Sequence, residues 1–549
     1  MDWQRTVLLG AMGVVVWLLV IQWTQFEEAH SPVVSRETSE VIIPSDNLLP
    51  EVVEADELPE IVSLEKVESA SPLVDSRLVT VTTDVLEVVI DTLGGDIVQI
   101  NLREHLTKMK DEGGEPFTLL IRSSTNTYVA QSGLVGANGT DKKGRRPRFT
   151  VASDNFELLK EDDQLAVDLH TEQQGVKIVK RFVFTPGDYQ IGVQYLIDNM
   201  TSEPWSAVFY GQIKRDSLSP VVESVGVSPY LGAALRTEDK NYDKYDFGDM
   251  EDESVKSSFT GGWVAMVQHY FISAWVPPQD DINHYSLRKL SGRDIYLMGY
   301  TSPPIEIASG ESGQYKTQFY AGPKDQGKLA ELADYLDLTI DYGFLWMLAK
   351  PIFAALQIIY AWVGNWGWAI ILLTVSIKIL LYPLSAASLR SMAKMRKLQP
   401  EMQRLKDLYG DDRQKMSQEL MGLYKKEKVN PAGGCLPVLL QMPVFISLYW
   451  VLLESVEIRH ASWVLWVQDL SAKDPYFILP LIMGGSMFLM QKMQPTPPDP
   501  TQAKIMQIMP IAFTFFFMLF PAGLVLYWTV NNVLSILQQW YVNRQLNAG

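Results

Sequence analysis

The chain has 549 residues, of which 47% are hydrophobic, and its formal net charge is −17 at pH 7. This length is greater than that of one ordinary domain, so we expect two or more folded parts. The single cysteine, Cys435, excludes an intrachain disulfide, and the six histidines are scattered without the spacing of metal ligands. We therefore expect neither a metal nor a cofactor.

The first apolar run, residues 7–23, predicts a transmembrane anchor over residues 1–25. A cleaved signal peptide has a shorter apolar core with a small-residue cleavage site close behind it, whereas Glu27 and Glu28 follow this run. Arg5 precedes the run, so the positive-inside rule places the N-terminus in the cytoplasm.

An acidic segment follows the anchor. Residues 27–70 contain twelve Asp and Glu against Arg36 and Lys66, and they are short of aromatic residues. Such a segment buries too little apolar surface to fold alone. Residues 26–72 are therefore predicted to form an acidic disordered linker on the outer side of the membrane.

Residues 73–325 have the pattern of an all-β sandwich domain. Apolar and polar residues alternate over 78–90, 176–184, 189–197 and 205–213, and turn-forming residues separate the strands. Residues 322–329 (GPKDQGKL) come near the phosphate-loop pattern, but Leu329 replaces the hydroxyl that would bind Mg²⁺. The topology places this domain outside the cytoplasmic membrane.

The last third of the chain contains five further apolar runs, which predict spans at 366–382, 436–453, 476–490, 505–520 and 524–541. Residues 385–430 carry eleven Lys and Arg against six acidic residues, so this loop is expected in the cytoplasm. The span at 366–382 must then run inwards, which leaves no room for a span at 344–363, although that segment is also apolar. We predict six spans, both termini in the cytoplasm, an amphipathic interfacial helical region at 326–365, and a five-span core at 366–549.

Residues 384–430 predict a cytoplasmic helical hairpin inside this core. The arms meet near Gly410, and Asp411 or Asp412 is suited to cap the second helix. Each arm has one methionine-rich apolar stripe, which fits a hairpin core and an adaptable docking face equally well. The residues predicted to dock are Met395, Arg396, Lys397 and Met402. The basic face fits anionic headgroups or ribosomal RNA, and the sequence does not choose between them.

Lys378 is the only charged residue within the five apolar runs. A charge near the middle of a bilayer costs roughly 3 kcal/mol, and such residues usually face protein or a watery cavity. The alternative is a side chain that extends along the helix to the aqueous surface near Tyr382. In an inward-running helix the Cα–Cβ bond points away from that surface. On the residues alone, a functional charge and an extended surface lysine both stay open.

Seven short segments of the last third together carry a resemblance to a known family. They are 364–367 (GNWG), 382–384 (YPL), 391–400 (SMAKMRKLQP), 428–437 (KVNPAGGCLP), 441–443 (QMP), 469–475 (DLSAKDP) and 520–527 (FPAGLVLY). With them the chain resembles the YidC/Oxa/Alb family of membrane protein insertases. The extra first span and outer β-domain are similar to the Gram-negative type. The resemblance implies five helices around a polar groove, open to cytoplasm and lipid, which holds one positive charge.

The resemblance also implies roles for individual residues. The positive charge matches Lys378, where most bacterial members have arginine; lysine keeps the charge but loses the planar fork that holds a carboxylate with two hydrogen bonds. Thr374 and Trp528 match positions that contact substrates. Gln441 and Asn532 match groove-lining positions, with ordinary hydrogen bonding between helices as an equal alternative.

The function implied is that of a membrane protein insertase and chaperone, which is not an enzyme, in the bacterial inner membrane. The partners implied are nascent membrane proteins, the Sec translocon, ribosome–nascent chain complexes and membrane lipids. Rival interpretations are a solute transporter, a membrane-anchored carbohydrate-binding protein of the periplasm, and a structural assembly protein. A transporter would be expected to have inverted repeats and further intramembrane charges, and the sequence has neither.

Overall fold

The computed structural model describes residues 77–218, 229–409, 412–427, 429, 436–494 and 500–548. The anchor predicted at 1–25 and the linker predicted at 26–72 lie outside these residues, as does most of the segment 428–437. The chain divides into two compact units. The described part of the first unit lies within Ala387–Gly434 and Gln494–Ala503, and that of the second within Val53–Ala386, Cys435–Met493 and Lys504–Gly549.

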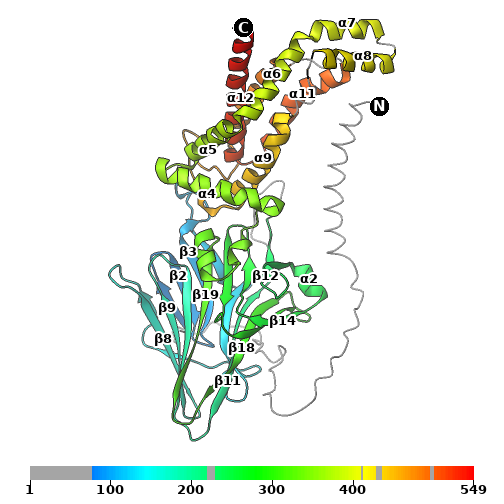
Figure 1. The fold of residues 1–549 in the computed structure, drawn as a ribbon. Helices are drawn as coiled ribbons and strands as arrows, with labels where there is room; N and C mark the ends of the chain where they lie inside the picture. Colours follow the sequence, from blue (N-terminus) through cyan, green and yellow to red (C-terminus); the bar gives the residue numbers. More distant parts are fainter. Residues whose placement is uncertain are drawn as a thin grey trace, which may run out of the picture. The chain divides into compact units, whose positions relative to one another are not determined.

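The β-strands of the second unit form two sheets (Figure 1). The first sheet contains β1 (Leu78–Thr82), β2 (Leu86–Asp91), β3 (Asp96–Leu106), β4 (Pro116–Arg122), β5 (Thr127–Val135), β7 (Asn155–Glu157), β11 (Trp205–Arg215), β14 (Val255–Thr260), β17 (Ile282–Lys289) and β18 (Tyr296–Ile307). Its strand order is β14-β17-β18-β11-β5-β4-β3-β2-β1-β7. A short helix, α2 (Phe247–Asp252), precedes β14.

The second sheet contains β6 (Thr150–Val151), β8 (Leu165–Gln173), β9 (Val176–Phe184), β10 (Gln190–Asn199), β12 (Gly232–Leu235), β13 (Asp243–Tyr245), β15 (Val264–Val267), β16 (Phe271–Val276) and β19 (Ser312–Pro323). Its order is β13-β12-β15-β16-β19-β10-β9-β8-β6. Burial alternates along β9 and β10, as their sequences predict, because successive side chains of a strand point to opposite faces.

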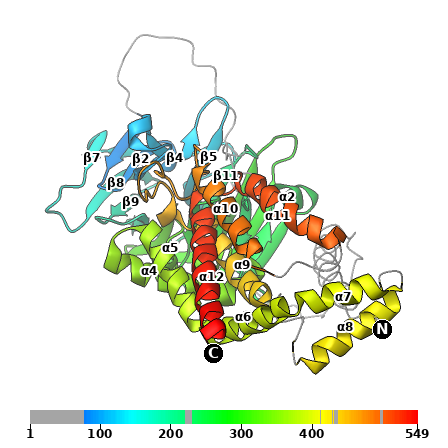
Figure 2. The ribbon, with the colours of Figure 1, turned by 90° about the horizontal axis from the view of Figure 1, so that it is seen from above.

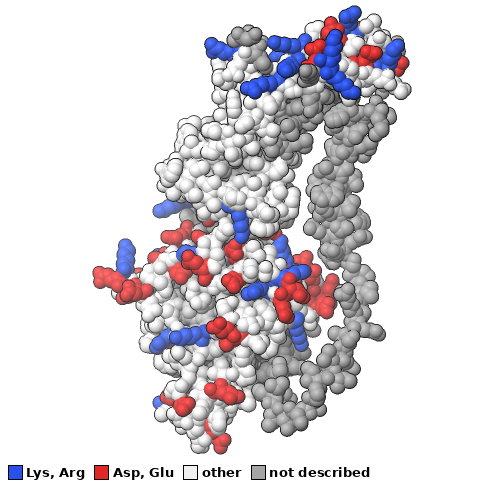
Figure 3. Space-filling model, viewed as in Figure 1, with Lys and Arg blue, Asp and Glu red and all other residues white. Residues whose placement is uncertain are grey.

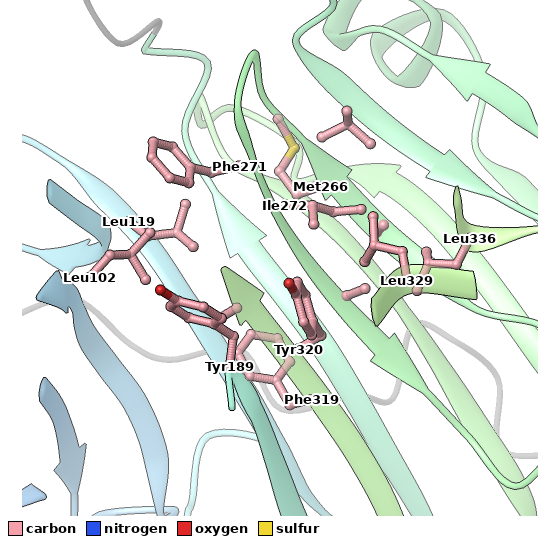
Figure 4. Packing of buried hydrophobic residues seen from close by; sticks show 14 of the residues in the cluster. Leu102, Leu119, Tyr189, Met266, Phe271, Ile272, Phe319, Tyr320, Leu329 and Leu336 are labelled. Atoms are coloured by element: carbon pink, nitrogen blue, oxygen red, sulfur yellow. The ribbon is translucent and has the colours of Figure 1, made fainter. Parts of the chain in front are cut away.

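Apolar side chains from both sheets fill the core of this β-domain (Figure 4). Leu102 and Leu119 come from the first sheet, and Phe271 and Tyr320 come from the second. The helix α3 (Gln326–Leu332) adds Leu329, which is fully buried against this core. The predicted all-β sandwich is confirmed, and the residue that departs from the phosphate-loop pattern has a packing role.

The helices of the second unit follow the β-domain. They are α4 (Trp346–Val363), α5 (Trp366–Leu380), α9 (Leu436–Glu454), α10 (Ile478–Lys492) and α12 (Ala522–Ala548), while α6 (Tyr382–Lys397) and α11 (Pro500–Phe517) cross the boundary between the units. Gly364 ends α4 in the left-handed conformation that glycine adopts without strain, and the side chain of Asn365 caps α5. α5, α10 and α12 lie side by side, and α4 runs across the bundle (Figures 1 and 2).

The span count predicted from the sequence is not established by helix lengths. Among the described residues, Gly343–Val363 is the one helix both long and apolar enough to cross a membrane, and it is the segment predicted to lie in the membrane plane. α5 and α6 meet at a bend of 69° and pass the same test only together. With 15 residues α5 is about 22 Å long, shorter than a bilayer core of about 30 Å. Six spans therefore stay a prediction.

The described part of the first unit contains a helical hairpin formed by α7 (Gln399–Tyr409) and α8 (Arg413–Lys426). Met402 and Leu420 are buried in it, and the hydroxyl of Tyr424 lies 3.8 Å from the sulfur of Met402. Asp412 caps α8 by accepting a hydrogen bond of 3.0 Å from the backbone N–H of Lys415. Of the two caps predicted, Asp412 is thus confirmed, and Asp411 lies outside the described residues.

Candidate functional site

Lys378 of α5 lies against α12. Its Nζ donates a hydrogen bond of 2.8 Å to Oγ of Ser535, and that hydroxyl donates to the backbone carbonyl of Asn531 at 2.7 Å. No carboxylate forms an ion pair with Lys378 within the described part of the chain. An ammonium group has three N–H donors, so two remain for water or a further ligand. The charge is held in place by a neutral hydroxyl, and no acidic residue among those described neutralises it.

One side of α12 supplies polar partners to the helices around it. Asn531 donates to Gln441 of α9 at 3.3 Å, and Asn532 donates to Ser486 of α10 at 3.0 Å. Further along, Gln538 donates to Ser385 of α6 at 2.7 Å. These contacts support the interhelical role that was the alternative for Gln441 and Asn532. The same contacts gather polar groups in an otherwise apolar bundle.

Thr374 and Trp528 differ in accessibility. Thr374 is 1% exposed, and its hydroxyl donates to the carbonyl of Ile370 in its own helix. Trp528 is half-buried, with its ring centroid 4.6 Å from that of Phe445 and 5.3 Å from that of Phe517. Its indole N–H has no hydrogen-bond partner among the described residues. Trp528 can meet a neighbouring segment as it stands, whereas contact at Thr374 requires its neighbours to move.

The four residues predicted to dock partners also differ in accessibility. Arg396 and Lys397 are exposed, and Met395 is half-buried. Met402 is buried between α7 and α8, so its surroundings fit the hairpin core. Lysine and arginine side chains gather over α6, α7 and α8, while the face of the bundle seen in Figure 3 has few charges.

Ser535, the residue that contacts the candidate charge, is not among the site residues predicted from the sequence. Its position in the sequence holds a signal, because Asn531, Ser535 and Gln538 recur at steps of four and three residues and so share one side of a helix. Three polar residues on one side of an apolar helix predict a polar surface inside a bundle. The partner on α5 was not predictable from this spacing alone.

Comparison with known proteins covers both parts of the chain. The family model described as the YidC periplasmic domain matches residues 78–355, and the model described as the 60Kd inner membrane protein matches residues 358–548. The membrane protein insertase YidC of Cellvibrio japonicus (strain Ueda107) is 51% identical over 555 residues, which cover 100% of this chain and 99% of that protein. The chain belongs to the YidC family of membrane protein insertases.

Other YidC proteins are similar to the same extent. That of Saccharophagus degradans is 52% identical over 557 residues, again with 100% of this chain and 99% of the relative covered. A solved structure of an active YidC insertase covers 88% of this chain and 95% of its own, with 19% identity and a TM-score of 0.39. Membership confirms the predicted family and identifies the β-sandwich as its periplasmic domain, attached to a helical part in the bacterial inner membrane. The orientation of the termini stays a prediction.

Proposed function

We propose that this chain inserts membrane proteins through the polar surface formed by α5 and α12, with Lys378 as its central positive charge. The observation that carries the proposal is the contact of Lys378 with Ser535, because it leaves a charge in an apolar bundle without an acidic partner among the described residues. Such a charge has a large electrostatic effect on any acidic group that enters the bundle.

In this mechanism the charge attracts acidic residues in the short extracytoplasmic tail of a nascent segment. The polar side of α12 shortens the purely hydrocarbon path and lowers the desolvation cost of moving polar groups. The apolar segment then passes Trp528 into lipid, where burial of its apolar surface drives completion. No covalent bond forms or breaks, and no nucleotide or metal takes part.

We also propose the finer features of this assembly. Both termini lie in the cytoplasm, and α4 lies in the periplasmic membrane interface. The basic helices α6, α7 and α8 dock partners on the cytoplasmic side, with Met395, Arg396 and Lys397 at the end of α6. The candidate partners are ribosome–nascent chain complexes, the Sec translocon and membrane lipids. Contact with anionic headgroups or ribosomal RNA would follow from the exposed basic side chains of the hairpin.

Site-specific photocrosslinking in stalled insertion intermediates tests this route. A crosslinker at Trp528 is expected to capture a nascent membrane segment, and one at the buried Thr374 is expected to capture less. Leu380 of α5, which is 77% exposed and apolar, is a matched control. Equal capture from all three positions would contradict passage along α12.

A further inference from the structure

A cavity of about 420 Å³ lies where the periplasmic domain meets the loop after α9. Its walls come from the end of β3 and the residues that follow it, and from residues 459–468. Both walls belong to the same compact unit. A volume of this size is within the range of small-molecule sites.

Arg459 is the central basic group of this cavity. Its Nη2 donates a hydrogen bond of 2.6 Å to the carbonyl of Leu106, and its guanidinium carbon lies 5.6–5.9 Å from the ring centroids of Phe117, Tyr270 and Phe271. A guanidinium has five N–H donors, and no acidic residue of the described chain forms an ion pair with it. Asp469 attracts this charge without forming an ion pair among the described residues, so the half-buried group keeps N–H donors for an anion from outside the chain.

Two imidazoles face the same space. His105 and His460 both line the cavity. Burial, and then the positive charge of Arg459, lower the pKa of both rings. Burial, and then Arg459 and His460, lower the pKa of His105 to about 4, so at neutral pH it is an uncharged ring that can still donate one N–H. Asp469, the nearest acid to His460, already accepts hydrogen bonds from the backbone N–H groups of His460 and Ser471.

The rim of the cavity carries charges of both signs, with Lys110 opposed by Glu104 and Asp111. All three side chains are exposed, so water and salt screen them, whereas the charge of the half-buried Arg459 is screened less. The charge of Arg459 in the interior therefore favours an anion, although the exposed rim has one more negative charge than positive.

The loop that forms one wall has the composition of a membrane interface. Leu465 is 77% exposed, and Trp463 and Trp466 on either side of it are half-buried, with their indole N–H groups buried in the protein. Tryptophan and exposed apolar residues concentrate at the level of lipid headgroups. Ser462 and Gln468, which flank this stretch, line the cavity.

We propose that Arg459, His105 and His460 bind a phosphate group, either that of a phospholipid headgroup in the periplasmic leaflet or free phosphate. Arg459 supplies the charge and a planar fork that matches phosphate geometry. The two imidazoles supply further N–H donors. The site is separate from Lys378, and it concerns the docking of the periplasmic domain on the membrane, not the insertion route.

Binding measurements on the purified full-length protein in detergent test the proposal. The probes are inorganic phosphate, a short-chain phosphatidylglycerol, and an acidic peptide without phosphate. Arg459→Gln is expected to weaken phosphate or lipid binding about tenfold or more, since a hydrogen bond to a charged group is lost. His460→Asn, which suits the left-handed backbone at this position (φ of +59°), is expected to weaken it less. Lys108→Gln is the control, because Lys108 lies in the same loop but does not line the cavity.

The probes separate the two sources of the phosphate. Lipid binding that depends on Arg459 supports a headgroup, and binding of inorganic phosphate alone, with the same dependence, supports the free ion. If Arg459→Gln does not fold, the comparison of His460→Asn with the control Lys108→Gln tests the site, and equal binding by these two variants overturns the proposal. Binding that is unchanged by both variants in folded protein, or capture of the acidic peptide only, overturns the proposal.

Discussion

Lys324 and Glu454 form a buried ion pair, with Nζ of the lysine 2.7 Å from Oε2 of the glutamate and side-chain exposures of 2% and 4%. Lys324 directly follows β19, and Glu454 is the last residue of α9. Close by, a ring nitrogen of His269 lies 2.8 Å from the carbonyl oxygen of Leu453. The periplasmic domain is thus joined to α9 by buried polar contacts as well as by the chain itself.

The first prediction concerns this ion pair. Lys324→Met leaves Glu454 buried without its ion-pair partner, so the free energy of unfolding measured in urea is expected to fall by about 3–5 kcal/mol. Lys350→Met breaks the more exposed pair with Asp337, at 26% and 17% exposure, and is expected to cost about 1 kcal/mol or less. Equal losses in the two variants would show that burial of the Lys324–Glu454 pair has no special effect.

The second prediction concerns pH. Burial, and then the charge of Lys324, lower the pKa of His269 from 6.5 to about 4. Between pH 6.5 and pH 4 the unfolded chain therefore binds a proton at His269 that the folded protein does not bind. The contribution of neutral His269 to the free energy of unfolding is complete above pH 6.5 and is lost as the pH falls towards 4. The thermal midpoint is expected to drop over this range. His269→Gln, which keeps a donor for the Leu453 carbonyl, is expected to flatten the drop, and an unchanged slope would contradict the assignment.

The third prediction concerns Ser535. Ser535→Ala removes the acceptor that holds Lys378. The net free energy of one hydrogen bond, about 1 kcal/mol, corresponds to roughly fivefold slower insertion of a substrate with an acidic tail. Ser535→Thr keeps the hydroxyl and is expected to retain most activity. A substrate with a neutral tail is the internal control. If Ser535→Ala slows both substrates equally, the hydroxyl acts on packing and not through Lys378.

The fourth prediction separates the two interpretations of the hairpin. Met402 is buried, so Met402→Ala is expected to destabilise α7 and α8 by about 2 kcal/mol or more, seen as faster amide hydrogen exchange in both helices. Arg396 and Lys397 are exposed, so Arg396→Gln and Lys397→Gln are expected to change exchange less than Met402→Ala does while weakening partner binding. Rapid exchange in the two charge variants as well would assign these side chains to the hairpin's own stability.

The β-domain and the helix positions could be predicted because their signals are local. Strand alternation in β9 and β10, the Gly364–Asn365 break and the Asp412 cap each depend on residues close in sequence. The predicted span at 366–382 extends two residues past α5, because apolar composition continues beyond the end of the helix, and the 69° bend between α5 and α6 was not predicted.

Within the site, composition identified Lys378 but not its partner. The contact with Ser535 joins residues 157 positions apart, and only the packing of α5 on α12 brings them together. The burial of Thr374 and the buried pair of Lys324 with Glu454 have the same origin. Sequence spacing indicates which side of a helix is polar, and tertiary packing decides what that side meets.

The central claim is that the positive charge of Lys378 drives the transfer of acidic tails, and one measurement tests it most directly. Lys378→Glu, Lys378→Gln and Lys378→Arg are compared in proteoliposomes for insertion of a substrate with an acidic tail and of its neutral-tailed counterpart. We predict that the acidic substrate is inserted well with Lys378→Arg, more slowly with Lys378→Gln and slowest with Lys378→Glu, while the neutral substrate varies little. Equal insertion of the acidic substrate by the arginine and glutamate variants, at equal protein levels, would contradict the account.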